Sequence, residues 1–210
     1  MKVFVATPTF DGKVCNEYLL SLLRLKEATD FKLCLIPGVH FVDMARDIAA
    51  AKFLKTDCTH LMFIDSDMGF PPDAVNRLIA HDKPVVGGAY RIRHDDELYP
   101  AYGGTPSFDL HQVQIIGGGF MCIQRHVIEA LWGAVPHYNT SNVGEVAAMF
   151  SREIHDGVMV SEDVMFCRRV AGFGVWIDPN IDFDHVGGKT YSGNYRQYLQ
   201  GVMENETDIQ

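Results

Sequence analysis

The chain has 210 residues, of which 47% are hydrophobic, 21% charged and 11% aromatic. These proportions are typical of a globular protein and exclude a disordered chain, a collagen and a coiled coil. The 18 Lys and Arg against 27 Asp and Glu give a net charge of −9. Because polyanion binding relies on basic side chains that neutralise phosphates, we expect neither a nucleic-acid partner nor binding to an anionic membrane surface.

The cysteine pattern and the hydropathy suggest a compartment. Five cysteines are scattered without a CxxC spacing, namely Cys15, Cys34, Cys58, Cys122 and Cys167. This odd, irregular set favours free thiols in a reducing compartment. No apolar run approaches the ~20 residues of a membrane span, and no signal-peptide pattern precedes the first apolar run. We therefore expect a cytoplasmic protein without a transmembrane segment, bacterial or, if viral, in the host cytoplasm.

The first half of the chain alternates between predicted strands and helices. In order, we expect strand 3–6, helix 16–29, strand 31–36, helix 44–55, strand 60–64, helix 71–79 and strand 84–86. The first strand should break into a loop at Thr7, Pro8 and Thr9, and Asp43 is the expected N-cap of the second helix. Such alternation is typical of βαβ units around a mostly parallel sheet.

The pattern changes after Gly87. Glycine-rich, hairpin-like segments around 102–104 and 113–124 precede a predicted helix at 126–131, and residues 136–160 read as irregular. A helix at 162–171 and a strand at 174–177 follow. We therefore predict one α/β domain over residues 1–210, with a small antiparallel β region added in its second half.

Two aspartates follow the third predicted strand. Asp65 and Asp67 flank Ser66 directly after residues 60–64. Because side chains alternate along an extended chain, both carboxylates are expected on one side, at the edge where open α/β sheets bind ligands. Paired oxygen ligands there suit Mg²⁺ or Mn²⁺ that also holds substrate phosphates. For this motif by itself, a loop turned by aspartate hydrogen bonds is an equal alternative.

A second pair of carboxylates opens a predicted helix. Ser161 precedes Glu162 and Asp163 at the start of residues 162–171. Serine is a frequent N-cap and acidic residues complement the helix dipole, so a structural role accounts for the pattern. In the functional alternative, a carboxylate kept ionised there accepts a proton from an attacking hydroxyl.

His185 and the segment after it form the third candidate. A neutral imidazole is a good ligand for ions of the Mn²⁺ type, although most of the nine histidines are expected to be surface or core residues. The glycine-rich segment that follows carries Lys189. It is either a mobile flap that brings a cation to a phosphate or a flexible tail.

These features occur in the order, and with the flanking residues, of a known family. From Val3 to about Gly188, the chain resembles the GT-A family of nucleotide-sugar glycosyltransferases. The motifs that carry the resemblance are Val5-Ala6-Thr7-Pro8-Thr9, Ala45-Arg46-Asp47, Phe63-Ile64-Asp65-Ser66-Asp67-Met68 with Pro71-Pro72, Val86-Gly87-Gly88-Ala89-Tyr90, Gly117-Gly118-Gly119-Phe120-Met121, Ser161-Glu162-Asp163-Val164, Ala171-Gly172-Phe173 and Asp178-Pro179 before His185. Each motif is weak, and their joint order is specific.

The resemblance implies a Rossmann-like GT-A fold, a mostly parallel central sheet flanked by helices. It implies a nucleotide-binding half at 1–100, an acceptor-binding and catalytic half at 101–190 and a C-terminal tail at 191–210. The nucleotide diphosphate sugar, with uridine diphosphate favoured by family frequency, would be bound by these residues: Thr7, Pro8, Thr9, Arg46, Asp65, Ser66 and Lys189. Asp65, Asp67 and His185 would hold Mn²⁺ or Mg²⁺.

The resemblance also implies roles in the reaction. Asp163 would be the base that deprotonates a glycan or other hydroxyl acceptor, which gives inversion, and Glu162 would orient the acceptor or donor sugar. Gly118 and Gly119 would let the backbone approach the sugar. Arg91 or Arg93 would bind the diphosphate or an acidic acceptor, with solvated surface arginines as an equal alternative.

Other readings stay open at this point. Some GT-A members retain configuration without such a base. A sugar-phosphate nucleotidyltransferase has a similar core, but its first loop is glycine-rich and carries arginine, whereas residues 6–13 hold one glycine and no arginine. A non-catalytic carbohydrate- or nucleotide-binding protein derived from a transferase is the alternative outside enzymes. The acceptor, for which residues 138–160 are the candidate segment, and the oligomeric state are not specified.

Overall fold

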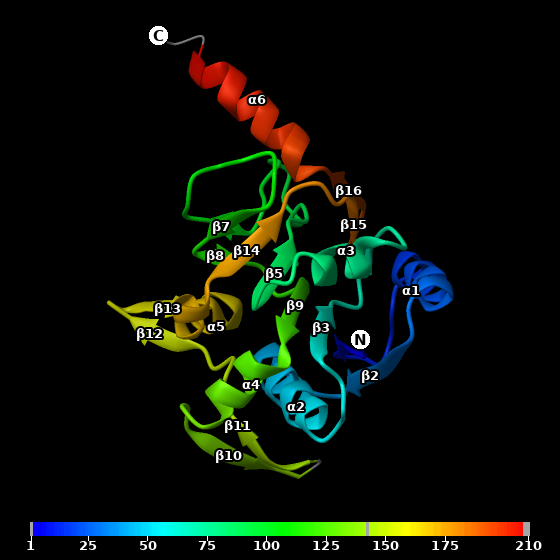
Figure 1. Ribbon diagram of the computed structural model, residues 1–210, viewed down its shortest axis with the longest axis vertical. Coiled ribbons are helices and arrows are strands. Elements are labelled where there is room, and N and C mark those ends of the chain that lie inside the picture. Colours follow the sequence, from blue (N-terminus) through cyan, green and yellow to red (C-terminus); the bar gives the residue numbers. More distant parts are fainter. Residues whose placement is uncertain (1, 142, 208–210) are drawn as a thin grey trace.

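A computed structural model describes residues 2–141 and 143–207, and its centre is a seven-stranded sheet (Figure 1). The strand order is β2-β1-β3-β9-β5-β14-β7. Five strands point the same way, whereas β9 and β7 run antiparallel to their neighbours. The bounds are β1 Val3–Thr9, β2 Phe31–Pro37, β3 His60–Ile64, β5 Val85–Gly88, β7 His111–Val113, β9 Phe120–Gln124 and β14 Val175–Asp178. The predicted α/β class with a mostly parallel sheet is confirmed.

Helices cover both faces of this sheet. On one face α1 (Asn16–Ala28) and α3 (Ala74–Ala80) pack on the side chains of Val5 and Met62. On the other, α2 (Val42–Leu54), α4 (Arg125–Trp132) and α5 (Glu162–Arg169) pack on Phe4 and Phe63. Because both faces of β1 and β3 are buried, their sequences are apolar without alternation. The result is a three-layer sandwich.

Short antiparallel pairings are added around this core, mainly by the second half of the chain. Their bounds are β4 Met68–Gly69, β6 Ala101–Tyr102, β8 Ile115–Ile116, β10 His137–Thr140, β11 Gly144–Ala147, β12 Glu153–His155, β13 Val158–Val160, β15 Phe183–Val186 and β16 Thr190–Gly193. The pairings are β6 with β8, β10 with β11, β12 with β13, and β16-β15-β4. The predicted antiparallel region is thus confirmed. A 3₁₀ turn (Ala171–Phe173) follows α5, and α6 (Tyr195–Thr207) projects from the end of the molecule (Figure 1).

Four local expectations were wrong. β1 continues through Pro8 to Thr9. Beyond Ala6 the strand is paired only with β2, so Pro8 lies where one side of the strand is unpaired and its missing N–H is tolerated. The N-cap of α2 is Phe41, and Asp43 lies inside the first turn. Residues 136–160 are not irregular but contain two hairpins. The expected C-terminal tail includes most of β16 and all of α6, and residues 208–210 lie outside the described part.

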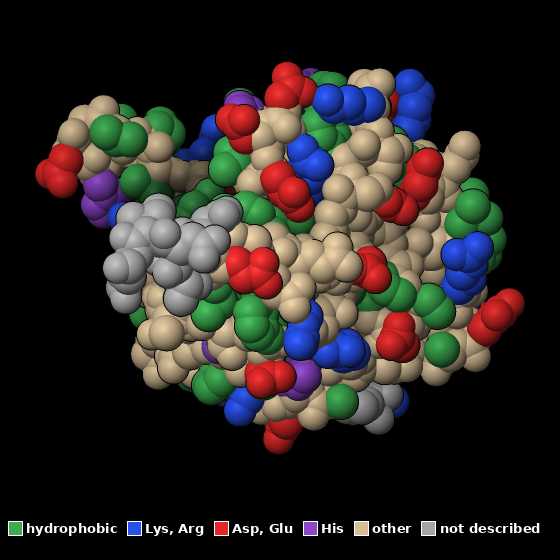
Figure 2. Space-filling model, turned by 90° about the horizontal axis from the view of Figure 1, so that it is seen from above, with side chains coloured by type: hydrophobic (Ala, Val, Ile, Leu, Met, Phe, Trp, Pro, Cys, Tyr) green, Lys and Arg blue, Asp and Glu red, His purple; other side chains and the backbone are tan. Residues whose placement is uncertain are grey.

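The surface shows no segregation of charge on the face seen in Figure 2, where Lys and Arg lie among Asp and Glu. Within the described residues, none of the helices has the length and apolar character needed to cross a bilayer.

A buried carboxyl group fastens the second half of the chain to α2. Asp47 is 2% exposed. It accepts hydrogen bonds from the Phe150 backbone N–H and the Tyr138 hydroxyl, both at 2.9 Å. Burial raises the pKa of Asp47 to about 7, against the lowering effect of these two donors.

This raised pKa makes stability depend on pH. The folded state holds the Asp47 proton up to about pH 7, whereas the unfolded chain releases it near pH 4, so stability falls as pH rises through this window. At ~1.4 kcal/mol per pKa unit, the loss is at most about 4 kcal/mol. Asp47→Asn keeps an acceptor for Phe150 and should remove this loss. Urea unfolding of both proteins from pH 4 to pH 8 tests this, and parallel pH profiles would contradict it.

Candidate active site

The site is organised around a buried arginine. Arg46, on the second turn of α2, is 2% exposed. Its Nη2 donates to Asp65 Oδ1 at 2.9 Å, its Nε lies 3.7 Å from Glu162 Oε1, and its guanidinium stacks 5.1 Å from the ring centroid of Phe63. Burial opposes the charged form, but the two carboxylates outweigh it and raise the pKa of Arg46. Arg46 therefore joins α2, the end of β3 and the start of α5.

The glycines before β9 are required by this packing. A Cβ on Gly118 would lie 2.9 Å from the guanidinium carbon of Arg46, and one on Gly119 would lie 2.8 Å from the Tyr90 hydroxyl oxygen. The expectation that these glycines make room for a sugar therefore has a competing explanation, since the protein's own side chains fill that space. The Asp65 N–H also donates to the Gly119 carbonyl at 2.9 Å, which ties this turn to the end of β3.

Backbone hydrogen bonds fix the loop that carries the two aspartates. The Ser66 carbonyl accepts from Cys15 N–H at 2.9 Å, and the Asp67 carbonyl accepts from Val186 N–H at 2.8 Å. The two side chains then diverge, because Asp65 pairs with Arg46 while Asp67 pairs with Arg93. The two aspartates thus have different arginine partners, although both line the same cavity.

His185 lies on the Asp67 side of the site. β15 pairs with β4 so that His185 is opposite Met68, and its Nε2 is 3.7 Å from Asp67 Oδ2. Its Nδ1 lies 3.0 Å from the Arg91 carbonyl, which can only accept, so Nδ1 carries the proton. Nε2 is therefore the ring nitrogen that faces Asp67. Burial raises the pKa of Asp67, but His185 and Arg93 outweigh it, and the pKa lies below its ordinary value.

The second acid pair meets Arg46 through Glu162. Ser161 is the N-cap residue of α5 by backbone geometry, and its hydroxyl donates to Asp163 rather than to the backbone of the first turn. Asp163 Oδ1 also accepts from Val164 N–H at 2.8 Å. Burial, reinforced by Asp163 and opposed by Arg46, raises the pKa of Glu162. Ser161 is thus the N-cap by its backbone conformation, but its side chain does not cap the helix.

A cavity of about 230 Å³ lies where the nucleotide was predicted. Its walls come from the end of β1, from the connection between β2 and α2 and from the aspartate loop. They consist of Pro8, Phe10, Val39, His40, Val42, Asp65, Ser66 and Asp67. The rings of Phe10 and His40 meet edge to face with centroids 5.0 Å apart. The cavity thus joins an apolar and aromatic wall to a carboxylate wall.

The other predicted nucleotide contacts differ in accessibility. The Thr7 hydroxyl is buried and bonded to the Tyr18 hydroxyl at 2.6 Å, so it faces away from this cavity. Thr9 Oγ1 is buried without a partner. Lys189 is exposed and pairs with Asp95 at 2.8 Å. These assignments stay predictions.

The two arginines after β5 are not free surface groups. Arg93 pairs with Asp67 and is half exposed. Arg91 donates to the Asp95 carbonyl at 3.0 Å and faces the Tyr191 ring at 5.9 Å, while its Nε is buried without a partner.

Tyr90 is a site residue that sequence reasoning did not single out. Its hydroxyl accepts from Gly119 N–H at 3.1 Å, and its ring packs edge to face on His185 with centroids 5.3 Å apart. Burial raises the pKa of Tyr90, as do Asp65 and Asp163 nearby. Tyr90 thus connects the His185 side to the glycine turn. Its place in the motif of residues 86–90 was the available signal.

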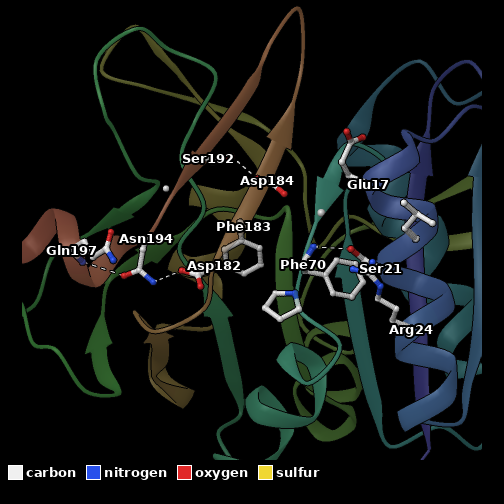
Figure 3. Close-up of a pocket in the computed structure, with 14 residues that line it drawn as sticks. Glu17, Ser21, Arg24, Phe70, Asp182, Phe183, Asp184, Ser192, Asn194 and Gln197 are labelled. Carbon is white, nitrogen blue, oxygen red and sulfur yellow. Dashed lines mark hydrogen bonds between the residues drawn. The ribbon is translucent and has the colours of Figure 1, made fainter.

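A larger groove, of about 630 Å³, lies elsewhere and contains none of the predicted site residues. Figure 3 shows Phe70 and Phe183 at its centre, with Glu17, Ser21 and Arg24 of α1 on one side and Asn194 and Gln197 on the other. Asp184 contributes to it from the residue before His185, so the two side chains extend to opposite faces of β15.

In the part of the chain that the structure describes, no three His, Cys, Asp or Glu side chains are gathered as a metal-binding group. Asp67 and His185 approach each other, whereas Asp65 bonds to Arg46. The three predicted metal ligands are therefore neighbours in the site without forming a complete set.

No protein-family model and no curated protein matches this chain. Among solved structures it is similar to A197 from STIV, with a TM-score of 0.61 and 18% identity over 93% of this chain and 91% of that one. GalNAc-T7 with UDP, GalNAc and Mn²⁺ has a TM-score of 0.52 and 12% identity, over 89% of this chain and 44% of that one. S. aureus TarS 1–349 with UDP-GlcNAc has a TM-score of 0.51 and 12% identity, over 94% of this chain and 61% of the TarS chain.

These likenesses establish the fold, and the expected GT-A arrangement is confirmed. The chain spans 44% of the GalNAc-T7 chain and 61% of the TarS chain.

The packing of Gly118 on Arg46 can be tested by a single methyl group. Gly118→Ala forces the buried guanidinium away from Asp65 and should lower the free energy of unfolding by about 1–3 kcal/mol. Gly172→Ala is the matched control, because a Cβ there meets nothing within 4 Å. Denaturant unfolding measures both. Equal stabilities of the two variants would contradict the close packing.

Proposed function

We propose that this chain is a metal-dependent glycosyltransferase that moves a sugar from a UDP-sugar to an acceptor hydroxyl. The observation that carries the proposal is the meeting of two acid pairs around buried Arg46 at the carboxyl edge of the sheet. The fold shared with TarS bound to UDP-GlcNAc, and with GalNAc-T7 bound to UDP and Mn²⁺, supports the choice of donor and ion.

The cavity between β1, the residues before α2 and the aspartate loop is assigned to the nucleotide. Pro8, Phe10 and His40 offer flat and apolar surfaces for a base, and Asp65 and Ser66 offer acceptors for ribose hydroxyls. Arg93, released from Asp67, is available to a phosphate. The nucleotide therefore enters with its anionic end towards Asp67.

The residues on the Asp67 side fit a divalent cation. Asp67 Oδ1 is buried without a hydrogen-bond partner, and His185 Nε2 lies 3.7 Å from Oδ2 of the same carboxylate. A carboxylate oxygen and a neutral imidazole suit Mn²⁺. The Arg91 carbonyl fixes the ring orientation that makes Nε2 available. Asp67 and His185 would hold the ion, with Asp65 beside it, and the bound ion neutralises the leaving diphosphate.

Asp163 is assigned as the base in an inverting reaction. It lies on the first turn of α5, directly after the β12–β13 hairpin, while Glu162 lies against Arg46. The acceptor hydroxyl proton passes to Asp163 as the hydroxyl oxygen bonds to the anomeric carbon and the diphosphate leaves. Glu162, mostly buried and with a raised pKa, serves to orient a sugar hydroxyl.

Metal-dependent nucleotide binding is the first test of this function. We expect UDP with Mn²⁺ to raise the melting temperature by about 5 °C or more at saturating ligand, since binding at 100 times Kd adds ~2.7 kcal/mol. UDP alone should give a much smaller shift. In Asp67→Asn the Mn²⁺-dependent part should disappear.

Asp109→Asn, an exposed carboxylate outside the site, is the control for the Asp67 variant. No metal-dependent shift with UDP or any other nucleoside diphosphate would overturn the proposal. Pyrophosphate release from a nucleoside triphosphate and a sugar phosphate would favour a nucleotidyltransferase instead.

The base assignment has a separate test. Asp163→Asn should lower kcat by about 10²–10⁴-fold while leaving the UDP–Mn²⁺ thermal shift intact, because the residue acts on the acceptor. UDP release in the presence of a glycan acceptor panel measures turnover. Near-normal turnover of this variant, or retained configuration in the product, would contradict the role of Asp163.

A further inference from the structure

Arg93 binds the carboxylate that the proposed function gives to the metal ion. Its Nη2 donates to Asp67 Oδ2, and the same oxygen lies 3.7 Å from His185 Nε2. Oδ1 of Asp67 is buried and has no hydrogen-bond partner among the described residues. The guanidinium group is therefore bonded to the carboxylate oxygen that faces the other residue assigned to the ion.

The aliphatic stem of Arg93 packs on the backbone that follows β15. A Cβ added to Gly187 would lie 2.7 Å from Arg93 Cδ, so the stem crosses this residue in close contact. A Cβ added to Gly188, the next residue, would meet nothing within 4 Å. The absence of a side chain at position 187 thus lets Arg93 reach Asp67.

The contact compensates a carboxylate that is mostly removed from water. The Asp67 side chain is 25% exposed, whereas that of Arg93 is 46% exposed. A carboxylate in such a place needs a cation or hydrogen-bond donors beside it. Arg93 provides both, and because its own side chain is half exposed, it can turn away once another cation takes its place.

Further positive groups border this contact. Tyr191 of β16 lies opposite His185 of β15. The Nζ atom of Lys189 and the guanidinium carbon of Arg91 lie 4.9 and 5.9 Å from the centroid of the Tyr191 ring. Lys189 also pairs with Asp95. A divalent ion that enters alone therefore approaches a region that already holds several cations.

We propose that Arg93 competes with the divalent ion for Asp67, so that Mn²⁺ and a nucleoside diphosphate bind to the site cooperatively. An ion that binds alone leaves Arg93 without its partner and beside a second positive charge. A diphosphate offers oxygens that accept from the guanidinium as it leaves Asp67. This inference rests on the proposed function, because it takes Asp67 as a ligand of the ion.

The competition predicts a direction that a purely structural role of Arg93 does not. If UDP raises the affinity for Mn²⁺ by some factor, Mn²⁺ raises the affinity for UDP by the same factor. Removing the guanidinium group frees Asp67, so Mn²⁺ alone should bind more tightly and the factor should become smaller. An arginine that only stabilised its loop would, on removal, weaken ion binding.

Titration with Mn²⁺, followed by electron paramagnetic resonance of the free ion, tests the proposal with and without UDP. Arg93→Gln should bind Mn²⁺ alone about fivefold or more tightly than the wild type, and UDP should add correspondingly less. Arg152→Gln is the matched control, because Arg152 is 40% exposed and pairs with Asp43, which is 17% exposed. Neither residue lines the nucleotide cavity, so this variant should match the wild type. Circular dichroism checks that both variants fold.

Gly187→Ala separates the contact from the charge. The added methyl group should move the Arg93 stem away from Asp67 while every charge of the site is kept. Mn²⁺ alone should therefore bind more tightly to Gly187→Ala than to the wild type. Gly188→Ala is the control, because its methyl group meets no other residue, and it should match the wild type.

The outcomes distinguish this inference from the proposed function. If the wild type binds Mn²⁺ with UDP but Arg93→Gln binds Mn²⁺ alone no better than the wild type, the competition is overturned and the proposed function stands. If Gly187→Ala binds no better than Gly188→Ala, the gain in Arg93→Gln comes from charge alone, which also overturns the competition. No Mn²⁺ binding by the wild type or any variant, with or without UDP, would overturn both.

Discussion

A buried guanidinium group is the constraint on which the site depends. Removing a charge from water costs several kcal/mol unless partners compensate, and Arg46 is compensated by Asp65, by Glu162 and by the face of Phe63. Those partners come from β3 and α5, which are about a hundred residues apart in the chain. Burying Arg46 therefore requires the end of β3 and the start of α5 to meet, and it requires glycine at position 118.

The same contact separates the chemical roles of the acids. Asp65 and Glu162 face Arg46, whereas Asp67 faces Arg93 and His185, and Asp163 bonds to the start of its own helix. One carboxylate of each pair thus pairs with Arg46, and the other has separate partners, which is why the proposed function gives Asp67 to the ion and Asp163 to the acceptor. Tyr90 links the two sides through the Gly119 N–H and the His185 ring.

The sequence predicted the features that depend on neighbouring residues, and it missed those that depend on contacts between residues far apart in the chain. Apolar runs and glycine and proline positions located the main strands and helices, because these signals are local. The pairing of Asp47 with Tyr138 joins residues far apart in the chain, so no local pattern indicated it. The hairpins of residues 136–160 were missed because their strands are short and largely exposed, and therefore lack a regular alternation of apolar and polar residues. The arginine partners of Asp65 and Asp67, Arg46 and Arg93, come from other parts of the chain, so the aspartate motif alone did not indicate them.

The central claim is that Arg46 assembles a site that activates a nucleotide sugar. Release of UDP from a panel of UDP-sugars, followed with and without Mn²⁺ in the absence of acceptor, tests it most directly when wild type is compared with Arg46→Met. We predict slow, Mn²⁺-dependent UDP release by the wild type and its loss in the folded variant. No release from any UDP-sugar, or equal release by both proteins, would contradict the account.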